Sequence, residues 1–170
     1  MSTTMALKKT LRQFLFPSLT PKFLLRILGV AFASYVVFSQ ILIPMRIQGI
    51  SMEPTYRNGT FNFCWRGSYL FSKPQRHDVV AVRLAGNKIM LLKRVVALGG
   101  EQIEFRKGKL WVDGKTIEEP YVRYPCDWDL PPRIVEKGSV YVVGDNRNMF
   151  IENHHFGQTS IKRIVGVPLW

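Results

Sequence analysis

Hydrophobic positions gather in one long apolar run near the start of the chain. Residues 27–44, ILGVAFASYVVFSQILIP, contain no ionisable group apart from the phenol of Tyr35. At about 1.5 Å per residue, a helix of this length approaches the ~20 residues that cross a bilayer core. The apolar run is longer than the apolar region of a cleavable signal peptide, and no small-x-small cleavage site follows it before Met45. The run therefore predicts a retained membrane anchor, with a buried helix of a soluble domain as the alternative.

After residue 44 the pattern changes to short alternating or β-branched segments separated by turn residues. Predicted strands cover residues 60–65, 79–84, 89–98, 102–105, 110–112, 140–143 and 164–167. Residues 121–132 hold three prolines and little periodicity, so they predict an irregular loop. We expect a mainly β fold over residues 45–170, either a folded-over antiparallel sheet or a small barrel, with residues 101–138 as a hairpin and loop excursion.

The first predicted strand and the two predicted hairpins show the clearest patterns. In residues 60–65, Phe61, Phe63 and Trp65 share one face, as in a half-buried strand. The strands 79–84 and 89–98, and then 102–105 and 110–112, are each separated by a short segment that contains glycine. This spacing predicts two hairpins.

Charge is distributed unevenly along the chain. The 170 residues include 24 Lys and Arg against 12 Asp and Glu, a formal net charge of +12. Residues 1–26 carry five of the basic residues and no acid, so the remainder has 19 − 12 = +7, which argues against nucleic-acid binding. A basic segment before an apolar span predicts a cytoplasmic N-terminal segment and residues 45–170 on the outer side of the membrane.

Cysteine and histidine spacing argues against a metal site. Cys64 and Cys126 are too few for a disulfide scaffold, and the sequence leaves open whether they are bridged. The chain has no Cys-x-x-Cys or His-x-x-x-His spacing, and the adjacent His154 and His155 would point their rings apart.

Candidate chemistry begins at Ser51, within residues 49–55, GISMEPT. Ser51 lies seven residues beyond Pro44, so an extended chain keeps it within about 25 Å of the membrane face. A serine nucleophile needs a base, and the three histidines lie in no recognisable triad context.

Lysine is the alternative base, provided that burial keeps its amine neutral. Lys93 is the best candidate, because it is the first charge after four apolar residues, 89–92, and precedes Val95 and Val96. On a strand of period two, Lys93 and Arg94 point to opposite faces, so one of the two cations must face a dry environment.

Three segments in this order resemble the boxes of type I signal peptidases, which are membrane-anchored endopeptidases with a Ser-Lys dyad. They are SMEPT at 51–55, KRVV at 93–96 and GDNR at 144–147. The resemblance covers about residues 46–167. It implies a β-sheet catalytic domain of the signal-peptidase type behind a single transmembrane helix, in a bacterial inner membrane with the catalytic domain on the periplasmic side, and no cofactor.

The resemblance assigns roles to particular residues. It implies that Ser51 is the nucleophile and Lys93 the general base in peptide hydrolysis through an acyl-enzyme. The Ser51 N–H would help to form the oxyanion hole, where Gly49 lacks the hydroxyl that some members add. Positions that line shallow pockets for small side chains, as in Ala-x-Ala sites, are matched by Ile47, Met52 and Leu92.

Support for the dyad is implied at the third box. Arg94 and Asp145 resemble an ion pair that holds the lysine strand against the loop containing Asn146 and Arg147. The family commonly continues with Ser-x-Asp-Ser-Arg. Here the corresponding stretch is FIENH at 150–154, in which Phe150, Glu152 and His154 replace a hydroxyl residue, an acid and a base. Phe150 supplies no hydroxyl to the lysine.

The leading hypothesis is a membrane-anchored serine endopeptidase that removes signal peptides from exported precursor proteins, with the phospholipid membrane as its other partner and no nucleic acid. A specialised pilin- or conjugation-type peptidase of the same clan is one alternative. A soluble Ser-Lys autopeptidase is disfavoured, because residues 1–44 offer no helix-turn-helix pattern. A non-enzymatic anchored β module that binds lipid headgroups or a partner would require Lys93 to be exposed and far from Ser51.

Overall fold

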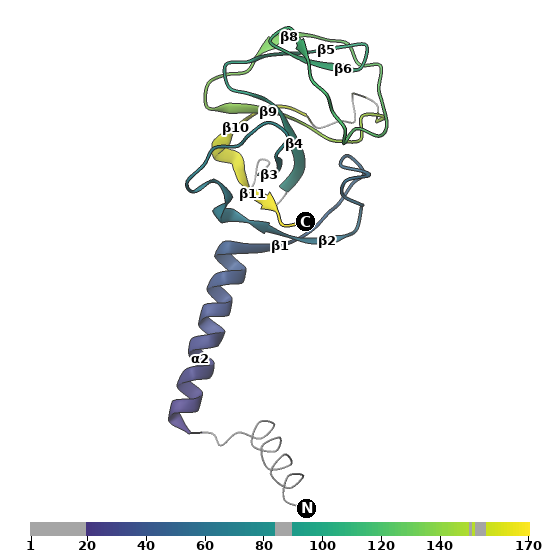
Figure 1. Ribbon diagram of the computed structural model, residues 1–170. Coiled ribbons are helices and arrows are strands. Elements are labelled where there is room, and N and C mark those ends of the chain that lie inside the picture. The colour runs from purple at the N-terminus through teal and green to yellow at the C-terminus, as the bar shows by residue number, and fades with distance from the viewer. Residues whose placement is uncertain (1–19, 84–89, 150, 152–155) are drawn as a thin grey trace, which may run out of the picture. The chain divides into compact units, whose positions relative to one another are not determined.

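The computed structural model describes residues 20–83, 90–149, 151 and 156–170 (Figure 1). The chain divides into two compact units, Met1–Ser39 and Gln40–Trp170.

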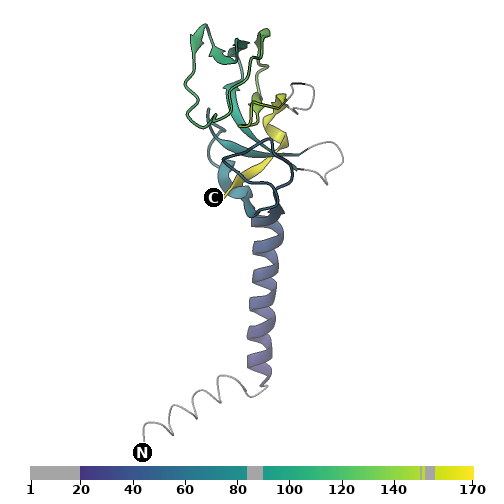
Figure 2. The same ribbon diagram turned by 90° about the vertical axis from the view of Figure 1, so that its right-hand side faces the viewer.

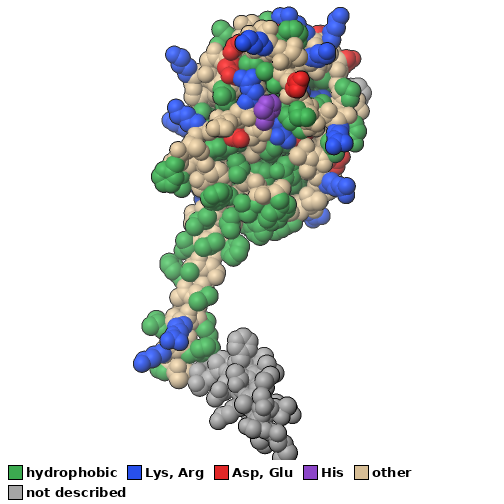
Figure 3. All heavy atoms as spheres, in the orientation of Figure 1, with side chains coloured by type: hydrophobic (Ala, Val, Ile, Leu, Met, Phe, Trp, Pro, Cys, Tyr) green, Lys and Arg blue, Asp and Glu red, His purple; other side chains and the backbone are tan. Residues whose placement is uncertain are grey.

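A single long helical segment opens the described chain. Helix α2, Pro21–Val36, is followed by one π-helical turn, η1, Val37–Ile41. The hydroxyl of Thr20 caps α2 by accepting the Phe23 N–H at 3.2 Å, and Pro21 suits the first turn because its missing N–H would have no helical partner. Pro21–Ile41 has a mean hydropathy of 1.7 and no buried residue, so by length and composition it can cross a membrane. Hydrophobic side chains cover most of α2, with Lys and Arg near its beginning (Figure 3).

A seven-stranded antiparallel sheet forms the larger part of the second unit. Its strands are β1 (Leu42–Arg46), β2 (Phe61–Trp65), β3 (Val79–Arg83), β4 (Met90–Leu98), β9 (Ser139–Val143), β10 (Gly157–Ser160) and β11 (Ile164–Pro168). They lie in the order β1-β2-β11-β3-β4-β9-β10. The hairpin predicted from residues 79–84 and 89–98 is confirmed as β3–β4, with Val80 opposite Lys93. Its turn, residues 85–88, falls outside the described residues.

A four-stranded antiparallel sheet forms the rest of this unit. It contains β5 (Gln102–Arg106), β6 (Lys109–Val112), β7 (Lys115–Thr116) and β8 (Leu130–Ile134), in the order β7-β6-β5-β8. The second predicted hairpin is confirmed as β5–β6. The prediction of a loop over residues 121–132 is wrong at its C-terminal end, where Pro131 and Pro132 belong to β8. Proline is tolerated there because β8 is an edge strand, which needs ladder hydrogen bonds on one side only. Short 3-10 turns, η2 (Arg66–Tyr69) and η4 (Ile161–Arg163), follow β2 and precede β11.

Strand β2 buries its polar face. Asn62 and Cys64 are buried, whereas Phe61 and Trp65 are 56% and 44% exposed, the reverse of what the apolar alternation indicates. The reason lies at the C-terminus, where the Asn62 side chain donates to the Trp170 carbonyl and accepts the Leu169 N–H. A polar side chain is buried cheaply when its hydrogen bonds are satisfied.

Strand β4 is covered on both faces. On one side Val95 packs with four valines of β3 and β9, and on the other side Val96 packs against a cluster that includes Phe105 and Leu110 of the four-stranded sheet. In Figure 1 the four-stranded sheet lies beside β9 and β4, and the turned view keeps it at the same end of the unit (Figure 2). Residues 93–97 are therefore all buried, charged ones included.

We predict that Gly166→Ala destabilises the Gln40–Trp170 unit. A Cβ at Gly166 would lie 2.2 Å from the Trp65 carbonyl oxygen, and backbone cannot yield as a flexible side chain can. The expected loss is about 1–3 kcal/mol, typical of overpacking, measured by urea unfolding followed by near-UV circular dichroism. Gly29→Ala is the control, because its Cβ would meet nothing within 4 Å. Equal unfolding midpoints for the two variants would contradict the close approach.

Candidate active site

Ser51 lies in the loop between β1 and β2. The base of this loop is closed by two backbone hydrogen bonds of 2.8 Å, from the Ile47 N–H to Thr60 and from the Gly59 N–H to Ile47. Gly49 has φ +92°, a conformation that favours glycine, and its N–H donates to the Asn58 side chain at 3.0 Å. The loop therefore has a defined shape, with Ser51 near its middle.

The structure brings Ser51 and Lys93 together. Lys93 Nζ lies 2.7 Å from Ser51 Oγ, a hydrogen-bond distance, and Lys93 is only 2% exposed. Desolvation by burial lowers the pKa of Lys93 from 10.5 to about 8, although the Asp145 carboxylate acts in the opposite direction. A substantial fraction of the amine is therefore neutral near pH 8. Such an amine can accept a proton from the hydroxyl that it contacts.

The 144–147 loop holds the backbone on both sides of Ser51. The Asn146 N–H donates to the Ser51 carbonyl at 3.0 Å, and Asn146 Nδ2 donates to the Ile50 carbonyl at 3.1 Å. Four residues beyond Ser51, the Thr55 hydroxyl donates to Asp145 Oδ2 at 2.6 Å. Three hydrogen bonds from one loop thus restrict the position of the serine.

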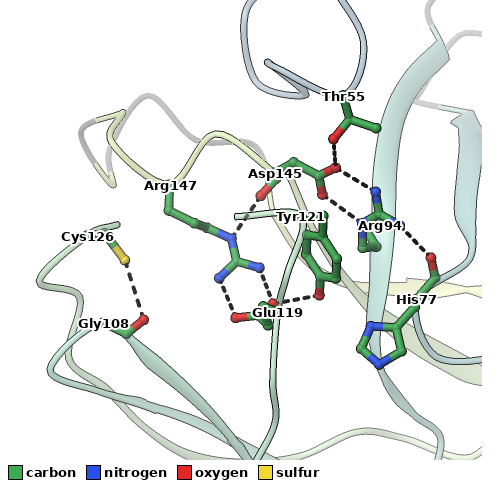
Figure 4. Close-up of polar contacts among 10 residues, drawn as sticks. Thr55, His77, Arg94, Gly108, Glu119, Tyr121, Cys126, Asp145 and Arg147 are labelled. Atoms are coloured by element: carbon green, nitrogen blue, oxygen red, sulfur yellow. Dashed lines mark hydrogen bonds and ion pairs between the residues drawn. The ribbon is translucent and has the colours of Figure 1, made fainter. Parts of the chain in front are cut away.

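Arg94 and Asp145 form a buried ion pair (Figure 4). Arg94 Nε and Nη2 donate to the two carboxylate oxygens at 2.8 and 2.6 Å, and Nη1 donates to the His77 carbonyl at 2.7 Å. Asp145 is fully buried. A surface ion pair contributes little to stability. This pair is bidentate and shielded from water, so its hydrogen bonds are stronger than those of a surface pair.

A cleft of about 500 Å³ adjoins the dyad and includes Ser51 in its wall. Ile47, Met52 and Leu92 all line it, together with backbone and side chains of β1 and β4. Ile47 and Met52 are 6% and 2% exposed, so they form the floor rather than the rim. A peptide bound here would meet both apolar side chains and polar groups, Arg46 and Gln48 among them, next to the serine hydroxyl.

Two further residues that the sequence analysis did not single out, Glu119 and Tyr121, belong to this region. Arg147 is 1% exposed, and its Nη1 and Nη2 donate to Glu119 at 3.0 and 2.5 Å. Glu119 also accepts a hydrogen bond of 2.7 Å from the Tyr121 hydroxyl. A buried arginine needs a carboxylate partner, but the sequence alone does not indicate which of the acids supplies it. Phe150, Glu152 and His154 fall outside the described residues.

The described part of the chain holds no group of three or more His, Cys, Asp or Glu that could bind a metal ion. Cys64 and Cys126 are free thiols, and burial raises the pKa of Cys64 to about 11.

Comparisons with known proteins agree with this geometry. A family model described as signal peptidase, peptidase S26, matches residues 21–168. Signal peptidase I V of Bacillus subtilis is 32% identical over 145 residues, which cover 77% of this chain and 86% of that protein. Thylakoidal processing peptidase 1 of Arabidopsis thaliana is 34% identical over 72% of this chain, which spans only 39% of that longer protein.

Among solved structures, a signal peptidase I from Enterococcus faecalis matches 56% of this chain and 97% of that one. Its sequence identity is 28% and its TM-score is 0.46. The family match extends over most of the chain, from α2 to β11. This chain therefore belongs to the signal peptidase family S26, a family of serine endopeptidases.

Proposed function

We propose that this protein is a membrane-anchored signal peptidase in which Ser51 is the nucleophile and Lys93 the general base. The observation that carries the proposal is the 2.7 Å separation between Ser51 Oγ and a lysine amine that is withheld from water. Membership of the family supports precursor proteins with signal peptides as substrates. The non-enzymatic β module required an exposed Lys93 far from Ser51, and the burial and distance of this pair weigh against it.

In the proposed mechanism, the neutral Lys93 amine takes the Ser51 proton as Oγ bonds to the scissile carbonyl carbon. The resulting ammonium returns a proton to the departing amide nitrogen, and the C–N bond breaks to leave an ester on Ser51. Lys93 then deprotonates water, whose oxygen bonds to the ester carbon. The C–Oγ bond breaks, the Lys93 ammonium returns the proton to Ser51 Oγ, and the new carboxyl terminus of the product leaves. The Ser51 N–H stabilises the oxyanion, and Gly49 contributes no hydroxyl to it.

We infer a preference for small side chains before the cut. Ile47, Met52 and Leu92 supply apolar surface close to Ser51, and the resemblance to the family implies shallow pockets there, which have no volume for large residues. We infer cleavage after Ala-x-Ala-type sequences, with residues on the amino side of the cut lying in this cleft.

We infer a single-pass arrangement in a bacterial inner membrane. In this arrangement the basic N-terminal segment, expected at residues 1–26, is cytoplasmic. The anchor, expected at residues 27–44, corresponds to the helical segment Pro21–Ile41, because Leu42–Arg46 form β1 and pair with β2. The catalytic domain, expected at residues 45–170, therefore includes β1 and lies on the periplasmic side. The apolar helical segment Pro21–Ile41 and the basic residues near its start support this orientation. Lipid is the second partner, and the uneven distribution of charge argues against nucleic acid.

Substitutions of the dyad test the proposed function directly. Ser51→Ala and Lys93→Ala should each reduce cleavage of an Ala-x-Ala precursor to background, because nucleophile and base act as one unit. Lys93→Arg should also fail, since a guanidinium keeps its proton. Detergent-solubilised variants are compared with wild type by gel assay, with circular dichroism as the control for folding. More than a few per cent of wild-type activity in any folded variant would refute the dyad.

The pH profile tests the burial of Lys93. Its folded pKa lies below the ordinary value of 10.5, at about 8, and only the neutral amine accepts a proton. We predict that kcat/KM for a soluble peptide rises with pH on a limb whose midpoint is near 8. Fixed-time cleavage assays at a series of alkaline pH values measure this dependence. A limb that climbs to the pKa of free lysine would show that the amine is hydrated in the working enzyme.

Removal of the helical unit separates anchoring from chemistry. A variant that begins at Gln40 keeps all of β1 (Leu42–Arg46), which pairs with β2. We predict near-normal cleavage of a short soluble peptide but at least tenfold slower cleavage of a precursor in vesicles, because the span raises the local concentration of substrate. Equal efficiency on both substrates would mean that the helix has no such role.

A further inference from the structure

The turn between β7 and β8 of the four-stranded sheet contacts the 144–147 loop. After β7, residues 119–122 form a turn in which the Val122 N–H donates to the Glu119 carbonyl at 3.0 Å. Pro120 occupies the second position, where its fixed φ suits the turn. Figure 4 shows the side chains of Glu119 and Tyr121 lying between Arg147 on one side and Arg94 on the other.

Four charged side chains and Tyr121 form a closed circuit here. Asp145 binds Arg94, Arg94 lies 4.0 Å over the Tyr121 ring, Tyr121 donates to Glu119, and Glu119 binds Arg147. The Arg147 Nε donates to the Gly144 carbonyl at 2.8 Å, which returns the circuit to the loop that contains Asp145. Two cations and two carboxylates balance each other in a region shielded from water.

The charge balance makes Glu119 important for Asp145. The side chains of Arg147 and Glu119 are 1% and 9% exposed. Without the Glu119 charge, a buried guanidinium would be left unpaired, which is costly, and the nearest carboxylate on its own loop is Asp145. Any competition for Asp145 loosens its bonds to Arg94 and Thr55, which are the contacts that connect the loop to the lysine strand and to the serine segment.

We propose that Glu119, assisted by Tyr121, is a positioning residue that fixes the 144–147 loop and thereby the separation of Ser51 and Lys93. Glu119 pairs with Arg147 and, through Tyr121, supports Arg94, the neighbour of Lys93. The loop in turn holds the Ser51 backbone through Asn146. This inference rests on the proposed peptidase function and assigns a catalytic purpose to the excursion between β5 and β8.

The test compares two neighbouring carboxylates. Glu119→Gln removes a buried charge, whereas Glu118→Gln makes the same chemical change at an exposed side chain. The assay uses full-length protein and a soluble Ala-x-Ala peptide. Glu119→Gln should lower kcat about tenfold, which corresponds to about 1.4 kcal/mol of lost transition-state stabilisation. Its KM should stay within about twofold of wild type. Glu118→Gln should match wild type. Equal kcat values for the two variants would overturn the positioning role.

A double-mutant cycle with Thr55→Val distinguishes positioning from simple stabilisation. Glu119 and Thr55 act on the same loop through different partners, so the loss in kcat for the double variant should be clearly smaller than the product of the single losses. Fully multiplicative losses would show that Glu119 does not act through the Asp145 loop, and would count against the proposal.

If Glu119→Gln fails to fold, Tyr121→Phe tests the positioning role instead. This substitution removes the hydroxyl that contacts Glu119 and keeps the ring over Arg94. We expect about a threefold loss of kcat with an unchanged melting temperature, from loss of one hydrogen bond to a charged group. Wild-type kcat in this variant would overturn the proposal. Wild-type protein that cleaves no peptide would refute the proposed function instead, whereas active wild type beside a fully active Glu119→Gln would refute only the positioning role.

Discussion

The burial of a lysine amine beside a serine hydroxyl is the constraint on which the rest of the structure depends. An ammonium group loses hydration when it is buried, so the folded protein favours the neutral amine at Lys93. The central position of β4, covered on both faces, provides that dry environment. The Ser51 hydroxyl lies 2.7 Å from the amine, so the proposed nucleophile also satisfies the polar atom that burial would otherwise leave unpaired.

Arg94, the next residue along the strand, is also buried, but it is held in its charged form. Arg94 points to the other face of β4 and keeps its charge, because Asp145 binds it with two hydrogen bonds. The same Asp145 charge raises the pKa of Lys93, so pairing this carboxylate with Arg94 limits an effect that would otherwise keep the lysine protonated. Asp145 therefore binds the charged Arg94 directly, whereas it acts on the pKa of Lys93 only through its electrostatic field.

Local sequence patterns predicted much of this arrangement. The apolar and β-branched runs at residues 79–84 and 89–98 predicted β3 and β4, and the alternation of side chains along a strand placed Lys93 and Arg94 on opposite faces. Strand β1 was missed, because it continues an apolar run without a change of pattern. The buried face of β2 depends on the distant C-terminal residues, and the partner of Arg147 depends on the turn at Glu119. Such contacts follow from tertiary folding, so no short stretch of sequence encodes them.

The site is assembled from segments that are far apart in the chain. Ser51 and Lys93 are 42 residues apart, and the bond from Asn146 to Ile50 spans 96 residues. Closing such long loops costs conformational entropy, so a fold that depends on these contacts forms slowly. Until they form, Lys93 is hydrated and has a pKa of about 10.4, so it is protonated at neutral pH and cannot act as a base. Under the proposed mechanism, a newly made or partly unfolded chain is therefore catalytically silent until β4 is buried and Ser51 lies beside Lys93.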